Sequence, residues 1–208
     1  YKTTRGVSLT EMINHSKSVR LGVQKSLMVV DMPYKTYDTS VSALKNSKKI
    51  MKETKCDAVK LEGGKKIIKQ IRALTKNNIP VMGHLGLLPQ SAKGKFKSKG
   101  KTTKEINQLI NDALLLQKNG VFAIVLECIK TPIAKQITKS LKIPTIGIGS
   151  SVYCDGQVLV TDDLIGLNQT NIKFVKKFLN VKKYINSGLR KFAYEVRTSK
   201  YPTKKHSY

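Results

Sequence analysis

The sequence has no long apolar run, and this lack narrows the classes of protein that it can encode. No stretch of about 18 or more apolar residues occurs among the 208 residues, and a membrane-spanning helix needs roughly that length. We therefore predict that the chain has no membrane span and no membrane partner. No charged-then-apolar leader precedes the first predicted helix, so we also expect no secretory signal in the chain as printed.

Cysteine is scarce as well. The three cysteines, Cys56, Cys128 and Cys154, are odd in number and share no metal-ligand spacing. Disulfide frameworks and structural zinc sites need paired or regularly spaced cysteines. We predict reduced thiols in a cytoplasmic protein, because disulfides are rare in that compartment.

Acidic residues and arginine are few for a chain so rich in lysine. The chain has 13 acidic and 39 basic residues, so its net charge is +26, and only five of the 39 basic residues are arginine. Such a charge would suit a nucleic-acid-binding protein, because lysine and arginine neutralise phosphates. Arginine is preferred for bidentate phosphate and base contacts, however, and the lysines are spread along nearly every predicted helix. We favour a compositional bias and expect no specific nucleic-acid partner.

Short apolar runs alternate with helical patterns along the chain. Strands are predicted at 26–31, 58–62, 79–86, 121–127, 143–149 and 156–163. Helices are predicted at 8–19, 39–52, 65–77, 104–118, 131–140 and 171–197, and a capping-box signature at 8–11 opens the first. Near-continuous apolar strands are typical of parallel sheets covered on both faces. We predict an α/β fold in a single domain over residues 1–208.

Polar residues at the strand ends favour a barrel over an open sheet. They are Asp31, Glu62, His84, Glu127 and Asp162, each at or near the end of a different predicted strand. A barrel gathers such ends in a ring at one face, whereas an open sheet usually carries a glycine-rich phosphate turn after its first strand. No such turn is present. We predict a (β/α)8 TIM barrel with about six of its eight strands in this chain, the other two preceding Tyr1.

The second predicted strand places two charges on one face. Side chains two residues apart share a face of a strand, so Lys60 and Glu62 point one way while Val59 and Leu61 point the other. Asp31, Glu62 and Glu127 offer oxygen ligands of the kind that Mg2+ prefers. A structural ion-pair network is the alternative interpretation of these charges.

Two further features leave alternatives open. His84 lies between Gly83 and Gly86 and is either a hydrogen-bonded core histidine or a substrate contact. The lysine-rich segment 93–101 is either an RNA-binding patch or a lid over the mouth of the barrel.

Several motifs, taken together and in order, resemble one known family. They are "DMPY" (31–34), "VKLEGG" (59–64), "GHLGLLPQS" (83–91), "VLEC" (125–128), "IPTIGIGS" (143–150) and "CDGQVLV" (154–160). The family that they resemble is ketopantoate hydroxymethyltransferase (3-methyl-2-oxobutanoate hydroxymethyltransferase). The ending at 201–208 is similar to the C-terminus of that family, so the resemblance covers essentially all 208 residues.

The resemblance implies a (β/α)8 barrel that transfers a hydroxymethyl group from 5,10-methylenetetrahydrofolate to 3-methyl-2-oxobutanoate in pantothenate biosynthesis, with Mg2+. Carried over by match, Asp31 and Glu62 would serve the metal, Glu62 directly or through a water. Asp31, Lys60 and His84 would bind the keto acid. Glu127 would be the acid/base residue that removes the proton next to the ketone, giving an enolate that Mg2+ stabilises as a Lewis acid. The resemblance also implies a homo-oligomer, a decamer, and leaves the folate-binding residues unidentified.

One departure and one rival interpretation accompany this resemblance. The "GDS" motif of the family, with a further metal-ligating Asp and a substrate-binding Ser, would lie before Tyr1, so we expect the 208 residues by themselves to be inactive. The rival is another Mg-dependent 2-oxo-acid enzyme, of the phosphoenolpyruvate mutase and isocitrate lyase group, which the family resembles in fold. Dependence on folate would distinguish the two.

Overall fold

Six parallel strands form one sheet whose spatial order follows the order of the chain, from β1 to β6. The computed structural model describes residues 4–92, 97–168 and 172–208. The strands are β1 (Val29–Asp31), β2 (Ala58–Glu62), β3 (Val81–Gly86), β4 (Ala123–Glu127), β5 (Thr145–Ile148) and β6 (Gly156–Gln157). An open doubly wound sheet reverses its strand order at a switch point, whereas a barrel adds each strand beside the last. The sequential order is therefore that of a half-barrel, and the prediction of a barrel fold is confirmed.

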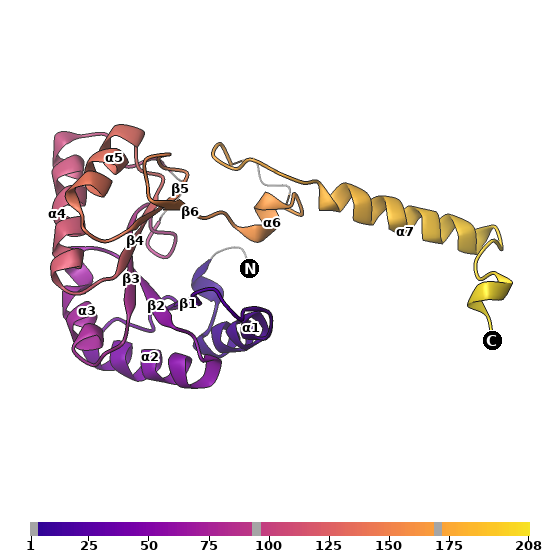
Figure 1. Ribbon diagram of the computed structural model, residues 1–208, viewed down its shortest axis with the longest axis horizontal. Helices are drawn as coiled ribbons and strands as arrows, with labels where there is room; N and C mark the ends of the chain where they lie inside the picture. Colours follow the sequence, from indigo (N-terminus) through magenta and orange to yellow (C-terminus); the bar gives the residue numbers. More distant parts are fainter. Residues whose placement is uncertain (1–3, 93–96, 169–171) are drawn as a thin grey trace. The chain divides into compact units, whose positions relative to one another are not determined.

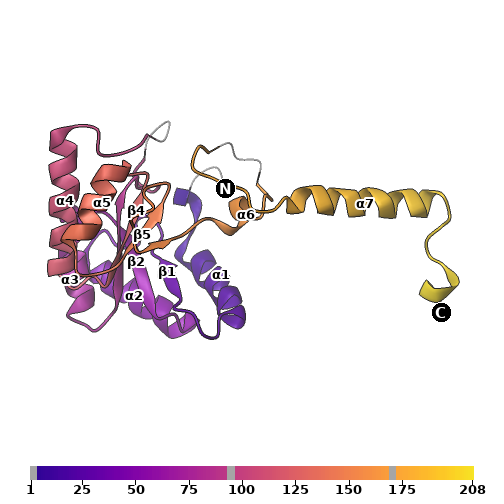
Figure 2. The same ribbon diagram turned by 45° about the horizontal axis from the view of Figure 1, so that its top comes forward.

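Helices precede and link the strands, and they cover the outside of the sheet (Figures 1 and 2). They are η1 (Thr4–Gly6), α1 (Leu9–Gly22), α2 (Ser40–Thr54), η2 (Lys65–Ile67), α3 (Ile68–Thr75), α4 (Thr103–Lys118) and α5 (Thr131–Ser140). The predicted capping box opens α1, because the Ser8 side chain accepts from Glu11 N and the Glu11 carboxylate accepts from Ser8 N. Such caps satisfy amides that the first helical turn leaves free.

The two faces of β2 separate core from site. Val59 and Leu61 are fully buried in the apolar cluster shared with the helices, while Lys60 and Glu62 on the opposite face are only partly buried. Burying each aliphatic side chain stabilises the fold by about 1.5–3 kcal/mol. The predicted division of this strand is therefore confirmed. The core lies between the sheet and the helices, and the charged face of β2 points away from it.

The chain divides into two compact units, residues 1–158 and 159–208. The second contains α6 (Thr161–Leu164), α7 (Val181–Arg197) and η3 (Lys204–His206). Within it, the amides of Phe178 and Val181 donate to carbonyls at the end of α6. The single-domain prediction stays a prediction. No helix in the described ranges is long and apolar enough to cross a bilayer.

Two elements predicted beyond residue 155 were wrong. The strand expected over 156–163 is only two residues long as β6, and Asp162 lies in helix α6 rather than at a strand end. Acidic residues in a first turn favour a helix start, and here they outweigh the apolar run before them. The helix expected from residue 171 begins at Val181, where Asn180 caps it by accepting from Lys183 N.

Candidate active site

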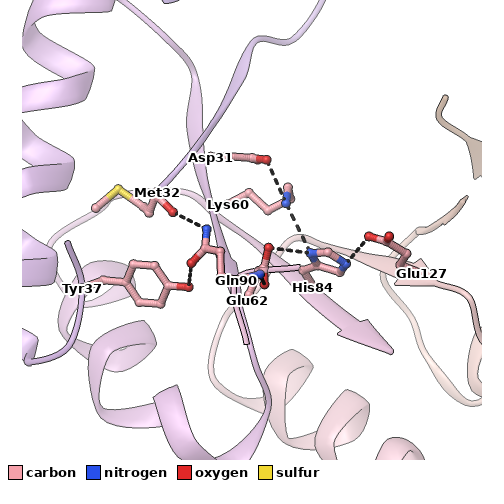
Figure 3. A network of polar contacts seen from close by, with 8 residues as sticks. All are labelled: Asp31, Met32, Tyr37, Lys60, Glu62, His84, Gln90 and Glu127. Carbon is pink, nitrogen blue, oxygen red and sulfur yellow. Dashed lines mark hydrogen bonds and ion pairs between the residues drawn. The ribbon is translucent and has the colours of Figure 1, made fainter. Parts of the chain in front are cut away.

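The carboxyl ends of β1 to β4 bring the charged residues of four strands together, as Figure 3 shows. At the β1 end, Asp31 Oδ2 lies 3.1 Å from Lys60 Nζ of β2. Asp31 aligns with Lys60 in the parallel register, which explains why the two side chains meet. The Asp31 side chain keeps 49% of its surface exposed, whereas Lys60 keeps 15%. The lysine is thus mostly buried, whereas the carboxylate that it contacts is accessible to solvent and to ligands.

His84 of β3 links the strands on either side of it. Its Nδ1 lies 3.3 Å from Lys60 Nζ and 3.8 Å from Glu62 Oε1, and its Nε2 lies 3.1 Å from Glu127 Oε2. An ammonium group can only donate, so Nδ1 accepts from Lys60 and the ring proton is assigned to Nε2, toward Glu127. The ring is buried, and among the described residues Nε2 has contact with Glu127 but no partner in hydrogen-bond geometry. This donor is available to a molecule bound beside Glu127.

Glu62 is the most enclosed carboxylate of the group, with 7% of its side chain exposed. Its Oε2 accepts from the backbone N–H of Gln90 at 3.0 Å. Burial raises the pKa of Glu62, and the nearby His84 and the Gln90 amide oppose that shift only in part. A buried carboxylate of this kind gains most from a neighbouring cation.

Gly86 at the end of β3 allows the backbone of β4 to lie very close to that of β3. It aligns with Glu127 in the register and has a φ of +100°. A Cβ at this position would overlap the backbone oxygen of Glu127. Only glycine therefore permits this contact.

The structure brings all the predicted site residues together. Asp31, Lys60, Glu62, His84 and Glu127 form one connected network in the first unit. Sequence reasoning did not assign Tyr37 and Gln90, which extend this network beyond Glu62 (Figure 3). The only signal was the position of Gln90 inside the motif "GHLGLLPQS", because its partners are far away in sequence.

The donor set fits a magnesium ion, although no group of three or more His, Cys, Asp or Glu side chains in the described ranges is placed to hold a metal. Mg2+ is usually held by one or two carboxylates and keeps several waters, so it needs no larger cluster of side chains. Asp31 offers a half-exposed carboxylate, and Glu62 is a carboxylate whose ionised form burial disfavours. The chemistry of these two groups therefore suits a hard cation.

A pocket of about 600 Å³ lies next to this network, in the connection that follows β3. Its lining includes Gly86, Leu87, Leu88, Ser91, Lys97 and Lys99. Lys99 is held by two contacts: its backbone N–H donates to the carbonyl of Cys128, and its Nζ lies 3.6 Å from Glu105. Residues 93–96 of the segment predicted as an RNA patch or a lid lie outside the described residues, so that choice stays open.

Comparison with solved structures agrees with the half-barrel. A 2,3-dimethylmalate lyase of the PEP mutase/isocitrate lyase superfamily superposes with a TM-score of 0.53 at 11% identity, over 96% of this chain and 72% of the other. A phosphonopyruvate hydrolase solved with oxalate and Mg++ gives a TM-score of 0.55 at 13% identity, over 98% and 74%. At such low identity these similarities concern the fold.

Sequence comparison goes further than the fold. Over 208 residues the chain is 61% identical to 3-methyl-2-oxobutanoate hydroxymethyltransferase of Pelagibacter ubique (strain HTCC1062), covering all of this chain and 80% of that protein. It is 44% identical to the enzyme of the same name from Clostridioides difficile (strain 630), covering all of this chain and 77% of that protein. The family profile described as ketopantoate hydroxymethyltransferase matches residues 1–204. The strand-end network thus lies within a match that spans nearly the whole chain, which belongs to the ketopantoate hydroxymethyltransferase family.

Proposed function

We propose that the protein transfers a hydroxymethyl group from 5,10-methylenetetrahydrofolate to 3-methyl-2-oxobutanoate, giving 2-dehydropantoate (ketopantoate) for pantothenate biosynthesis. The observation that carries this proposal is the connected network from Lys60 through His84 to Glu127, in a chain 61% identical to a relative of that name. The network offers a cation for an anionic substrate and a carboxylate for proton transfer. Both are needed to activate the carbon next to a ketone.

Lys60 is proposed to bind the keto acid. Its ammonium group lies at the β2 end, 3.1 Å from Asp31 and 3.3 Å from His84. A third donor remains for an oxygen of the substrate, because an ammonium group carries three N–H bonds. Asp31 and His84 would line the same site, since both contact this lysine.

Glu127 is proposed as the base that takes the proton from the carbon next to the ketone. Its Oε2 lies 3.1 Å from His84 Nε2, and 14% of its side chain is exposed, so the carboxylate lies in the network and is still accessible. General bases must lie within hydrogen-bond reach of the proton that they remove. Once this proton is removed, the activated carbon would attack the one-carbon unit of the folate.

Asp31 and Glu62 are the residues that we propose to hold Mg2+, Glu62 directly or through a water. When bound there, Mg2+ would supply Lewis-acid stabilisation of the charge that develops on the ketone oxygen. Glu62 is held by the Gln90 amide and Asp31 by Lys60, so both carboxylates are oriented by the chain itself.

The partners follow from the same proposal. They are the two small-molecule substrates and further copies of the chain, with a decamer as the expected assembly and no specific nucleic acid or membrane. The cytoplasm is the proposed compartment, and the three free cysteines, Cys56, Cys128 and Cys154, suit it.

A turnover assay tests this function. The protein, expressed from its complete reading frame, is supplied with 3-methyl-2-oxobutanoate, methylenetetrahydrofolate and Mg2+, with folate-free and EDTA-treated controls. We expect ketopantoate only in the complete mixture. If the folded protein consumed the keto acid without folate, the rival group of Mg-dependent 2-oxo-acid enzymes would be favoured instead.

A further inference from the structure

Gln90 is a buried polar residue with four hydrogen bonds to distant parts of the chain, one of which Arg5 Nε donates to its backbone carbonyl at 2.8 Å. It lies in the connection between β3 and α4 and is 8% exposed. Its backbone N–H donates to Glu62 Oε2 at 3.0 Å, and its Nε2 donates to the carbonyl of Met32 at 2.8 Å. Its Oε1 accepts from the Tyr37 hydroxyl at 2.7 Å. One residue thus ties the end of β1, the end of β2 and the connection after β3 together (Figure 3).

Only one orientation of the Gln90 side chain satisfies these partners. A backbone carbonyl can only accept, so the amide nitrogen must face Met32. The amide oxygen then faces Tyr37, whose hydroxyl must donate. Burial, with the Glu62 charge nearby, raises the pKa of Tyr37 far above its usual range, so this donor stays protonated. The side chain of Gln90 is therefore locked by two partners that fix its rotamer as well as its position.

The residues held in this way are neighbours of the proposed metal site. Met32 directly follows Asp31 in the chain, and its own N–H donates to the carbonyl of Lys60 at 2.9 Å. Glu62 receives the Gln90 amide on Oε2, which leaves Oε1 directed toward His84. The side-chain bonds to Met32 and Tyr37 hold the backbone at residue 90 in place. Without them the Gln90 N–H would no longer be fixed against Glu62, and this buried carboxylate would regain rotamer freedom.

We propose that Gln90, oriented by Tyr37, is a positioning residue that holds Glu62 and the chain beside Asp31 in the arrangement required to bind a divalent cation together with a 2-oxo acid. This inference rests on the function proposed above. Neither Gln90 nor Tyr37 needs to touch the substrate, because both act through the carboxylate and the backbone that they hold. Residues that orient the ligands of a metal typically affect metal affinity about 10–100-fold when mutated.

The test compares two variants with a matched control. Tyr37→Phe removes only the hydroxyl, and Gln90→Met replaces the amide by an apolar group of similar length. Thr145→Val is the control, because Thr145 is fully buried and its hydroxyl donates to Asp155 at 3.0 Å, outside the site network. All three variants lose buried hydrogen bonds, so all should lower the melting temperature.

Three readouts separate positioning from general destabilisation. Binding of Mn2+, as a paramagnetic substitute for Mg2+, is measured by electron paramagnetic resonance. Exchange of the proton on the carbon next to the ketone of 3-methyl-2-oxobutanoate is followed by NMR in deuterated water without folate. Complete turnover with folate is the third readout.

We expect Gln90→Met and Tyr37→Phe to weaken Mn2+ binding about 10-fold or more and to slow the exchange, while Thr145→Val leaves both within twofold of the wild type. Adding Tyr37→Phe to Gln90→Met should have no further effect on Mn2+ affinity, because Tyr37 acts through Gln90. If the wild type forms ketopantoate but both site variants bind Mn2+ like the control, the inference is overturned while the proposed function stands. A folded wild type that forms no ketopantoate would overturn the function and the inference with it.

Discussion

Carboxylates at the two ends of the same sheet are used in opposite ways. At the amino ends, Asp57 precedes β2 and accepts from Met28 N at 2.8 Å, and Asp155 precedes β6 and accepts from Thr145 N at 2.8 Å. Each aspartate thus joins the start of its own strand to the start of the preceding strand. Asp57 also lies 3.7 Å from the guanidinium group of Arg20. At the carboxyl ends, Asp31, Glu62 and Glu127 lie near the side chains of Lys60 and His84 within one network.

The carboxylates at the two ends differ in how fully hydrogen bonds within the fold satisfy their oxygens. Asp155 Oδ2 accepts from both the amide and the hydroxyl of Thr145, so backbone and side chain satisfy it within the fold. Glu62 has one oxygen bonded to the backbone N–H of Gln90, and the other lies 3.8 Å from His84 Nδ1 without a hydrogen bond between them. In barrels, polar residues at the amino ends of strands serve stability and those at the carboxyl ends serve function. The same side-chain chemistry therefore has different roles at the two ends of this sheet.

The largest expected effect concerns Glu127. Glu127→Gln keeps the shape and the contact with His84 but removes the base, so turnover should fall about 100- to 10,000-fold. Circular dichroism and the melting temperature should stay close to those of the wild type. Unchanged turnover would remove Glu127 from the proposed mechanism.

Lys60 should have the next largest effect. Lys60→Met keeps the aliphatic length and removes a charge-assisted donor worth about 1.5–3 kcal/mol, which is roughly a 10- to 150-fold loss of kcat/KM. The loss should appear mainly as a raised KM for the keto acid, measured at saturating folate. A normal KM for the keto acid would contradict substrate binding by this lysine.

Asp155→Ala tests the amino end of the sheet. The change leaves the buried amide and hydroxyl of Thr145 without their acceptor, at a cost of about 1–3 kcal/mol per unsatisfied group. The melting temperature should fall by about 2–4 °C for each kcal/mol lost. Below the melting transition kcat and KM should not change. A loss of activity in the folded variant would contradict a purely structural role for Asp155.

Whereas Asp155→Ala should lower the melting temperature, Glu62→Gln should raise it when divalent cations are absent. Because burial raises the pKa of Glu62, the native protein keeps a proton that the unfolded chain has already lost, so stability falls as pH rises above the ordinary glutamate range. A neutral amide removes this penalty. We expect a melting temperature about 2–4 °C higher at neutral pH, the shift for a change on the order of 1 kcal/mol.

The control for Glu62→Gln is the same measurement with Mg2+. The wild type should gain more stability from the ion than the variant does, because a bound cation would compensate the charge of Glu62. Equal gains in the two proteins would argue against Glu62 as a metal-site residue.

The smallest effect is expected at Cys128. Burial, and to a lesser extent the charge of Glu127, raise the pKa of its thiol to about 11. At pH 8 roughly a thousandth of the thiol would be ionised, so iodoacetamide should label it slowly in the folded protein. Mass spectrometry of the labelled sites gives the rate, with urea-unfolded protein for comparison. Glu127→Gln should speed labelling slightly, and equal rates in folded and unfolded wild type would contradict the prediction.

The fold was predictable where local signals agreed with one another. Apolar runs and a capping box placed the first strands and helices, and the strand-end polar residues pointed to a barrel. The prediction failed over 156–163, where "VLVTDD" resembles a buried strand but leads into helix α6 at Thr161. A short apolar run does not by itself distinguish a strand from the approach to a helix, and here the acidic residues decided the outcome.

The sequence by itself determined which strand ends carry charge, because alternation along β2 places Lys60 and Glu62 on one face whatever packs against them. Only the tertiary structure decided how these charges are held. The Gln90 side chain reaches Tyr37 and Met32 across 53 and 58 residues of sequence. Periodicity reports which face a residue occupies, but such a pairing exists only after β1, β2 and β3 have come together in the sheet.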